Sequence, residues 1–160
     1  MAERNDFLQK VVEIKRVSKK TEGGNRLSFT CLAVVGDGQG QVGAALCRAP
    51  DVYSAVRKAS RKAREKMIRV PLVGEHQTIP HRIELRRGAV HVLLKPAPPG
   101  TGLIIGGAMR AVAEAAGIKN LVGKNLGTRN KKNTVDATLK ALQLLNQPNK
   151  QRRRRVKKKD

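Results

Sequence analysis

The sequence predicts an α+β protein made of two units in succession. Three observations lead to this fold class: an alternating strand pattern near the N-terminus, a long amphipathic helix after it, and a second series of strands and helices beyond a break that contains proline. We place the boundary after residue 73. Residues 1–73 then form the first domain, residues 74–147 the second, and residues 148–160 a basic tail that is expected to be disordered.

Three strands open the first domain. Residues 7–17 alternate between apolar and polar side chains, residues 27–35 are rich in strand-forming residues, and residues 41–47 follow the tight turn "GDGQG". Alternate residues from Leu27 to Val35 are expected on one buried face. The short basic segment "SKKTEGGNR", residues 18–26, predicts a protruding hairpin loop between the first two strands. Together these strands are expected to form an antiparallel meander.

A helix is predicted over residues 49–67, with Pro50 in its first turn. Its apolar stripe comprises Val52, Val56, Ala59, Ala63 and Met67. Its other faces carry Arg57, Lys58, Arg61, Lys62, Arg64 and Lys66. These charges could form an ordinary solvated face. After Asp51, however, the helix has Glu65 alone to balance them, which favours binding to a phosphate backbone.

The second domain begins after residues 68–74, where Pro71 interrupts strand pairing. Two strands are predicted at residues 81–88 and 89–96, joined near Gly88. A helix follows over about 105–116. Its inward residues are Met109, Val112, Ala113 and Ala116.

Glycine and asparagine residues are predicted at the ends of the last two helices. Gly117, followed by the apolar Ile118, is expected as a glycine C-cap. Asn133 is expected to cap a final helix that extends to about Leu145, with Val135, Leu139 and Leu142 on one side.

The stretch "PAPPGTGLIIGGAMRAVAEAAG", residues 96–117, raises the question of a phosphate-binding loop. Its loop glycines are Gly100, Gly102, Gly106 and Gly107. They could cradle a nucleotide, serve packing and turns alone, or also let the backbone approach another macromolecule. The segment resembles the "PxxGxGxxSSA" loop of small-molecule kinases related to galactokinase and homoserine kinase. Glycine and alanine replace the serines here, however, and no recognisable carboxylate pair occurs in the second half.

Composition points to a polyanionic partner. The chain has 34 Lys+Arg against 12 Asp+Glu, a formal net charge of +22 that is spread over all three segments. Such a protein is expected to work beside nucleic acid, an anionic membrane or an acidic protein. Aromatic residues make up only 2%, too few for a platform that stacks single-stranded bases. We therefore expect contacts with phosphates and sugars of structured nucleic acid.

Other function classes find little support. Cys31 and Cys47 lack the spacing of a zinc site and are expected as buried thiols. No catalytic signature appears, so we expect neither an enzyme nor a cofactor or metal. The absence of a signal peptide and of a long apolar run predicts a cytoplasmic protein with no membrane partner.

Three segments give the chain a family resemblance: "RVSKKTEGGNRLSFTCLAVVGDGQGQVG" at 16–43, "VRKASRKAREKMIRVPL" at 56–72, and "GTGLIIGGAMRAVAEAAGIKNLVGKNLGTRNKKNTVDATLKAL" at 100–142. With their flanks they cover about residues 8–145. In this long, ordered match the chain resembles the bacterial small-subunit ribosomal protein number five family.

The resemblance implies a first domain like a double-stranded-RNA-binding module, with a sheet and one helix. It implies a second domain that is a two-layer sandwich with a left-handed β-α-β unit, as in galactokinase-type kinases. The implied role is structural and non-catalytic: a cytoplasmic protein of the small (30S) ribosomal subunit that binds 16S ribosomal RNA. The implied neighbours are small-subunit proteins number four and number eight and the mRNA near its entry channel, with effects on subunit assembly and decoding accuracy.

Candidate site residues follow from both lines of reasoning. The charge pattern of the helix gives Arg57, Lys58, Arg61 and Lys62 as RNA-binding candidates. The resemblance adds Arg16, Ser18, Lys19, Lys20, Gly23, Gly24, Asn25, Arg26 and Arg48. It also implies protein contacts at Gly100, Thr101, Gly102, Gly106, Gly107 and Arg110.

The sequence departs from the family pattern at two of these places. Arg48 stands where the family has a lysine in "GxGxGKAxEV", and Glu22 precedes Gly23 where a basic residue is common.

Overall fold

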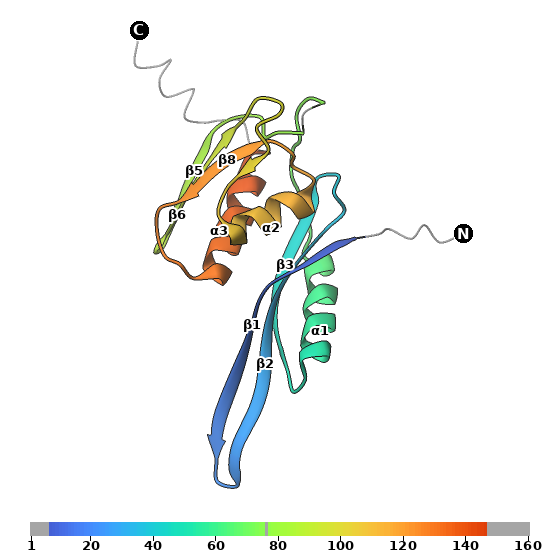
Figure 1. Ribbon diagram of the computed structural model, residues 1–160, viewed down its shortest axis with the longest axis vertical. Helices are drawn as coiled ribbons and strands as arrows, with labels where there is room; N and C mark the ends of the chain where they lie inside the picture. Colours follow the sequence, from blue (N-terminus) through green and yellow to red (C-terminus); the bar gives the residue numbers. More distant parts are fainter. Residues whose placement is uncertain (1–6, 76, 147–160) are drawn as a thin grey trace, which may run out of the picture.

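The protein is described by a computed structural model that covers residues 7–75 and 77–146. Two sheets and three helices alternate in layers (Figure 1). The first half contains β1 (Leu8–Thr21), β2 (Gly24–Gly36), β3 (Gln41–Ala49), α1 (Val52–Glu65) and β4 (Ile68–Arg69). The second half contains β5 (Ile83–Arg87), β6 (Val90–Pro96), β7 (Leu103–Ile104), α2 (Gly107–Ala116), β8 (Leu121–Asn125) and α3 (Lys131–Leu144). The predicted α+β class is confirmed, and the basic tail lies outside the described residues.

The first sheet has the strand order β1-β2-β3-β4 and is antiparallel throughout, as the predicted meander requires. Helix α1 covers one face, where Ala55 and Ala59 pack against Cys31, Ala33 and Cys47. Small residues on both sides allow the helix to lie close to the sheet. The burial of the opposite face of β2 was not predicted from the sequence.

The second face of β2 is buried by the other half of the chain. Leu32 and Val34 are as buried as Cys31 and Ala33, and they pack in the same cluster as residues of α2 and α3. A strand with apolar side chains on both faces is typical of a sheet that is covered on both sides.

Residues 18–26 form a two-stranded ribbon rather than the predicted loop. β1 continues to Thr21 and β2 starts at Gly24, so the turn itself is limited to Glu22 and Gly23. β3 pairs with β2 only from Phe29 onward, so the end of the ribbon has no third strand and projects from the body (Figure 1). The backbone ladder thus persists although both faces are exposed.

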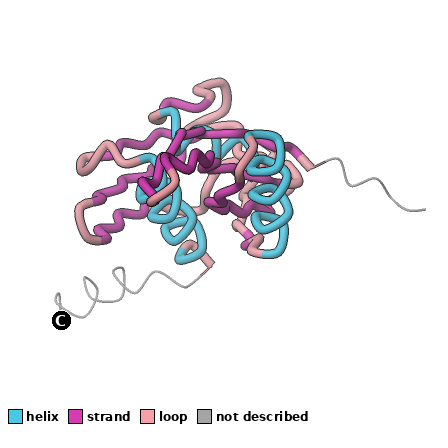
Figure 2. The backbone as a smooth tube through the Cα atoms, turned by 90° about the horizontal axis from the view of Figure 1, so that it is seen from below, coloured by secondary structure: helices cyan, strands magenta, loops and turns pink. Residues whose placement is uncertain are grey.

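The second sheet has the order β5-β6-β8-β7. β5, β6 and β8 are antiparallel neighbours, whereas β7 pairs with β8 in parallel, so that β7, α2 and β8 form a β-α-β unit. Neither β7, which has only two residues, nor β8 was predicted from the sequence. Figure 2, seen from below, shows the alternation of strand and helix layers.

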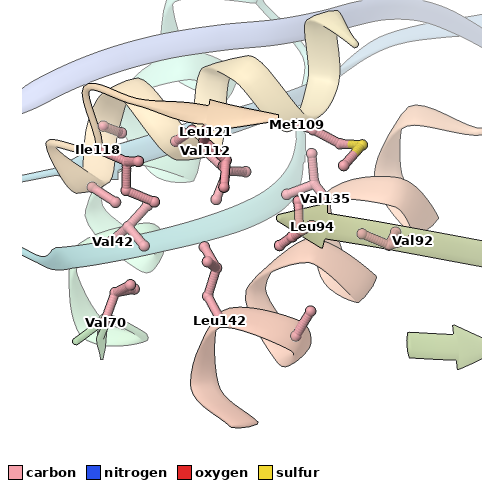
Figure 3. Close-up of a cluster of buried hydrophobic side chains, with 14 of the residues drawn as sticks. Val42, Val70, Val92, Leu94, Met109, Val112, Ile118, Leu121, Val135 and Leu142 are labelled. Atoms are coloured by element: carbon pink, nitrogen blue, oxygen red, sulfur yellow. The ribbon is translucent and has the colours of Figure 1, made fainter. Parts of the chain in front are cut away.

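One hydrophobic core joins the two halves. It includes Val42 and Val70 from the first half and Val112, Ile118 and Leu142 from the second (Figure 3). The domain boundary after residue 73 stays a prediction. The core shows that the segments on its two sides pack together.

Backbone contacts strengthen this junction at the C-terminal end of α2. The amides of Gly38 and Gly40 donate to the carbonyls of Ala115 and Ala116, at 3.1 and 2.8 Å. The last carbonyls of a helix have no hydrogen-bond donors inside the helix. Here a turn of the first half provides these donors. A Cβ on Gly117 would lie 1.9 Å from the Gly38 carbonyl oxygen, so glycine is required for this approach.

The observed helix ends agree with the prediction in one case and differ from it in two. Gly117 has φ +82° and Ile118 N donates to Ala113 O at 3.0 Å, which confirms the predicted C-cap. α1 is capped by Asp51, so Pro50 precedes the helix instead of lying in its first turn. α3 is capped by Asn130, whose Oδ1 accepts from the amides of residues 132 and 133 at 3.1 and 3.4 Å. The cap predicted at Asn133 was wrong, because the helix starts one turn earlier.

Candidate RNA-binding surface

The β1–β2 ribbon gathers most of the predicted loop residues. Its register places Ser18 opposite Leu27, Lys19 opposite Arg26, and Lys20 opposite Asn25. These residues are all exposed, as are Arg16 and the turn glycines Gly23 and Gly24. The turn is fixed by the Thr21 hydroxyl, which donates to the Gly24 carbonyl at 2.6 Å. The ribbon is therefore an ordered arm that carries cations on opposite strands.

A hollow at the base of the ribbon brings three of the predicted cations together. Lys19, Arg26 and Arg48 line it from β1, β2 and β3. Arg48 Nε donates to the Ser28 hydroxyl at 2.7 Å, which orients the guanidinium beside the ribbon. Pro50, the residue before the cap of α1, closes the same hollow. Two cations of the ribbon thus meet Arg48 of β3 just before the chain enters α1.

The four predicted cations of α1 are exposed and have no acidic partner among the described residues. The ion pairs found in residues 7–75 and 77–146 engage other groups: Lys10, Lys15, Arg82, His91, Arg110, Lys131 and Lys132. Arg57, Lys58, Arg61 and Lys62 take part in none of them. Arg64, one turn on, has its guanidinium carbon 5.0 Å from the centre of the Phe7 ring. This helix face offers positive charge that the described chain does not neutralise.

The aromatic residues differ in their surroundings. Phe7 and Phe29 pack against buried clusters, whereas Tyr53 on α1 is 73% exposed. Tyr53 lies at one end of a groove along a flank of α1. Its other lining residues are Gln9, Ser54, Val56, Arg57, Lys58, Ser60, Arg61 and Arg64. Tyr53 was not predicted as a site residue. It lies one helical turn before Arg57, however, and so it is on the charged side of the helix.

The predicted protein-contact residues fall into two groups. Gly100, Thr101 and Gly102 form the loop before β7, and the amide of Gly102 donates to Asn120 Oδ1 at 3.0 Å. Gly106 and Gly107 begin α2 on the other side of β7.

Arg110, the last predicted protein-contact residue, bonds within its own chain. Its Nη2 donates to the Leu103 carbonyl at 2.7 Å and its Nε lies 3.9 Å from Glu114 Oε1. The two residues are four positions apart in α2, the usual spacing of a surface helix pair. Glu114 also pairs with Lys10 of β1.

The structure distinguishes between the proposed roles of the loop glycines. An added Cβ at Gly100, Gly102, Gly106 or Gly107 would meet nothing within 4 Å, so none of the four is required for packing inside the chain. Gly100 and Gly102 have φ +87° and +71°, which their turns demand. Gly106 and Gly107 have no such need, so their bare backbone remains open to a partner.

A kinase-like nucleotide site is not supported. Two hollows border Gly107, of about 230 and 390 Å³, at or below the low end of the roughly 300–1,000 Å³ of ligand pockets. No carboxylate lines either of them. Within the described residues, no group of three or more His, Cys, Asp and Glu could hold a metal ion.

Cys31 and Cys47 are free, buried thiols, as expected. They lie opposite each other on β2 and β3, under α1. Burial raises the pKa of the Cys31 thiol, and the neighbouring Cys47 raises it further. These thiols therefore belong to the core and not to the charged surface.

Among the helices of the described ranges, none is both long and apolar enough to span a membrane.

Comparison with known proteins gives a consistent result along the chain. A model of the N-terminal domain of ribosomal protein S5 matches residues 7–71, and a model of its C-terminal domain matches residues 85–155. The small ribosomal subunit protein uS5 of Syntrophobacter fumaroxidans is 51% identical over 139 residues, which cover 87% of this chain and 82% of the relative. The uS5 protein of Chloroflexus aurantiacus is 49% identical over 134 residues, 84% of this chain and 74% of the relative.

Proposed function

The chain belongs to the ribosomal protein S5 family, and from this premise we propose that it is a structural constituent of the small ribosomal subunit that binds 16S ribosomal RNA. Its relatives bear the name small ribosomal subunit protein uS5. The role is non-enzymatic, and a small-molecule kinase activity finds no support in the family or in the hollows beside the glycine loop.

The observation that carries the proposal is the unpaired charge of the ribbon and α1. Lys19, Lys20 and Arg26 project from the body, and the four cations of α1 have no acidic partner in the described part of the chain. Uncompensated cations repel one another, so a phosphate backbone between them relieves repulsion and releases its own counterions. Most of these contacts would position the protein on folded RNA without reading its sequence.

We also propose particular neighbours for the chain within the small subunit. The bare backbone at Gly106 and Gly107, together with the loop at Gly100–Gly102, supports a contact with small-subunit protein number four, through which the chain would influence decoding accuracy. Protein number eight is the second proposed protein neighbour. The mRNA near its entry channel is proposed to pass close to the subunit surface that holds this chain.

A reconstitution experiment tests the proposal. The purified chain should bind a 16S transcript in a filter assay and should sediment with 30S particles that lack the endogenous protein. A ribbon variant, Lys19→Gln with Lys20→Gln and Arg26→Gln, should bind the transcript more weakly, with a shallower dependence on salt. A wild-type chain that stays at the top of the gradient and ignores the transcript at low salt would overturn the proposal.

A further inference from the structure

The groove along α1 ends in an exposed aromatic ring that phosphate contacts alone do not explain. Tyr53 is 73% exposed at the second position of the helix, and the groove runs from it to Arg64. This separation of eleven residues corresponds to about 16 Å along a helix. Arg57, Arg61 and Arg64 follow Tyr53 on the same flank.

The two ends of the groove offer different chemistry. The arginines provide positive charge along its length. At the Tyr53 end, the Asp51 carboxylate already accepts the amide of Ser54 at 3.3 Å, so this helix terminus places a negative charge where a phosphate would otherwise bind. The tyrosine therefore lies where a phosphate is disfavoured and an uncharged, flat group is accepted.

We propose that Tyr53 stacks on one unpaired nucleobase of the bound RNA, while Arg57, Arg61 and Arg64 hold the phosphates of the adjoining backbone. The proposal rests on the RNA-binding function argued above and adds a contact of a different kind to it. A tyrosine ring stacks on any base, and an arginine four residues later in the helix can lie over the same base. The low aromatic content of the chain is compatible with a single stacking position.

The chain supplies its own reporter for this contact, because it contains one tyrosine and no tryptophan. Stacking on a base should quench the fluorescence of Tyr53 when a 16S transcript is added to the full chain, after correction for absorption by the RNA. Binding without stacking would leave the corrected emission unchanged, and that result would overturn the proposal even if the transcript is bound.

Salt dependence separates stacking from charge. Tyr53→Ala should weaken binding to the 16S transcript by at least about fivefold, the lower end of what one stacked base contributes. The slope of log K against log salt should stay that of the wild type, because no phosphate contact is lost. Arg57→Gln should instead reduce the slope by about 0.7–0.9. Alanine is a better helix former than tyrosine, so Tyr53→Ala should still fold.

Two conservative variants complete the test. Tyr53→Phe keeps the ring and should bind like the wild type, whereas Tyr53→Leu keeps apolar bulk without the ring and should bind like Tyr53→Ala. Equal affinity of the alanine and wild-type chains would refute the stacking contact and leave the proposed function intact. Retained RNA binding by Tyr53→Ala with lost association to another small-subunit protein would assign the ring to a protein partner instead. Failure of the wild type to bind the transcript would remove the function itself.

Discussion

Removing the four unpaired cations of α1 should change the salt dependence of RNA binding by a calculable amount. The variant replaces Arg57, Lys58, Arg61 and Lys62 with glutamine. All four side chains are exposed and have no acidic partner in the described chain, so the helix should lose no internal contact. Glutamine has nearly the helix propensity of lysine and arginine, so the fold should persist.

The magnitude follows from counterion release. If each cation contacts one phosphate, the slope of log K against log salt should fall by about 2.8–3.6, since each contact contributes about 0.7–0.9. Over the fourfold range from about 50 to 200 mM salt, the ratio of variant to wild-type Kd should therefore shrink about 50- to 150-fold. Filter binding to a 16S transcript at four or five salt concentrations measures both quantities.

A matched variant controls for total charge. It carries glutamine at Arg86, Arg87, Lys95 and Lys124, which are exposed on β5, β6 and β8. Both variants lose four positive charges, but only the α1 variant loses cations of the proposed RNA-binding surface. A slope change in the α1 variant of less than about 0.7, or one equal to that of the control, would refute the assignment of this helix face to RNA.

Three further predictions concern the fold. Gly117→Ala should lower the free energy of unfolding in urea by more than about 1 kcal/mol, because alanine would have to adopt φ +82° with its Cβ against a carbonyl; Gly107→Ala, an open helical position, should leave it unchanged or raise it. Asn130→Ala should lower the free energy of unfolding by about 1 kcal/mol through loss of the N-cap, and Asn133→Ala should lower it by clearly less. A larger loss for Asn133→Ala would contradict the observed cap. Because burial raises the pKa of Cys31 and so reduces its thiolate, iodoacetamide should label this residue far more slowly in the folded protein than in urea near neutral pH, as mass spectrometry can measure. Equal rates would contradict the buried position.

Local periodicity was enough to predict the elements that have long, repeated patterns. The apolar stripe of α1, the alternation of residues 7–17 in β1 and the run of strand-forming residues 27–35 in β2 identify these elements because many residues repeat the same signal. The C-cap at Gly117 was predicted from one glycine and its apolar follower, a motif complete within two residues. Such features depend on neighbours in the sequence and not on the rest of the fold.

The missed elements depend on distant contacts. β7 has two residues, too few to show a periodic pattern. It is a strand because it pairs with β8, which follows it in the sequence only after α2. The choice between Asn130 and Asn133 as a cap is not settled by residue type, since asparagine suits both positions. The burial of β2 on both faces required knowledge that α2 and α3 lie against the first sheet.

The candidate site was predictable in composition but not in arrangement. The cations of residues 18–26 and of α1 could be named from charge alone. The meeting of Lys19 and Arg26 with Arg48 depends on the β1–β2–β3 register, and the groove that ends at Tyr53 depends on how β1 passes beside the helix. The position of Tyr53 near Arg57 was a weak sequence signal. Only the structure shows that this ring is exposed while the other two aromatic rings pack against buried clusters.

The placement of charge on projections limits the repulsion that a net charge of +22 creates within the fold. The ribbon extends beyond β3 by the residues from Val17 to Thr21, about 16 Å at 3.3 Å per residue. This length exceeds the Debye length of about 8 Å at physiological ionic strength, so charge at the tip, beyond the hollow that Lys19 and Arg26 share with Arg48, is largely screened from that of the body. In the part of the chain that the structure describes, no Asp, Glu, Lys or Arg is among the buried residues. Repulsion remains along α1, where successive cations lie one turn apart, and this helix should gain stability when a phosphate backbone binds beside it.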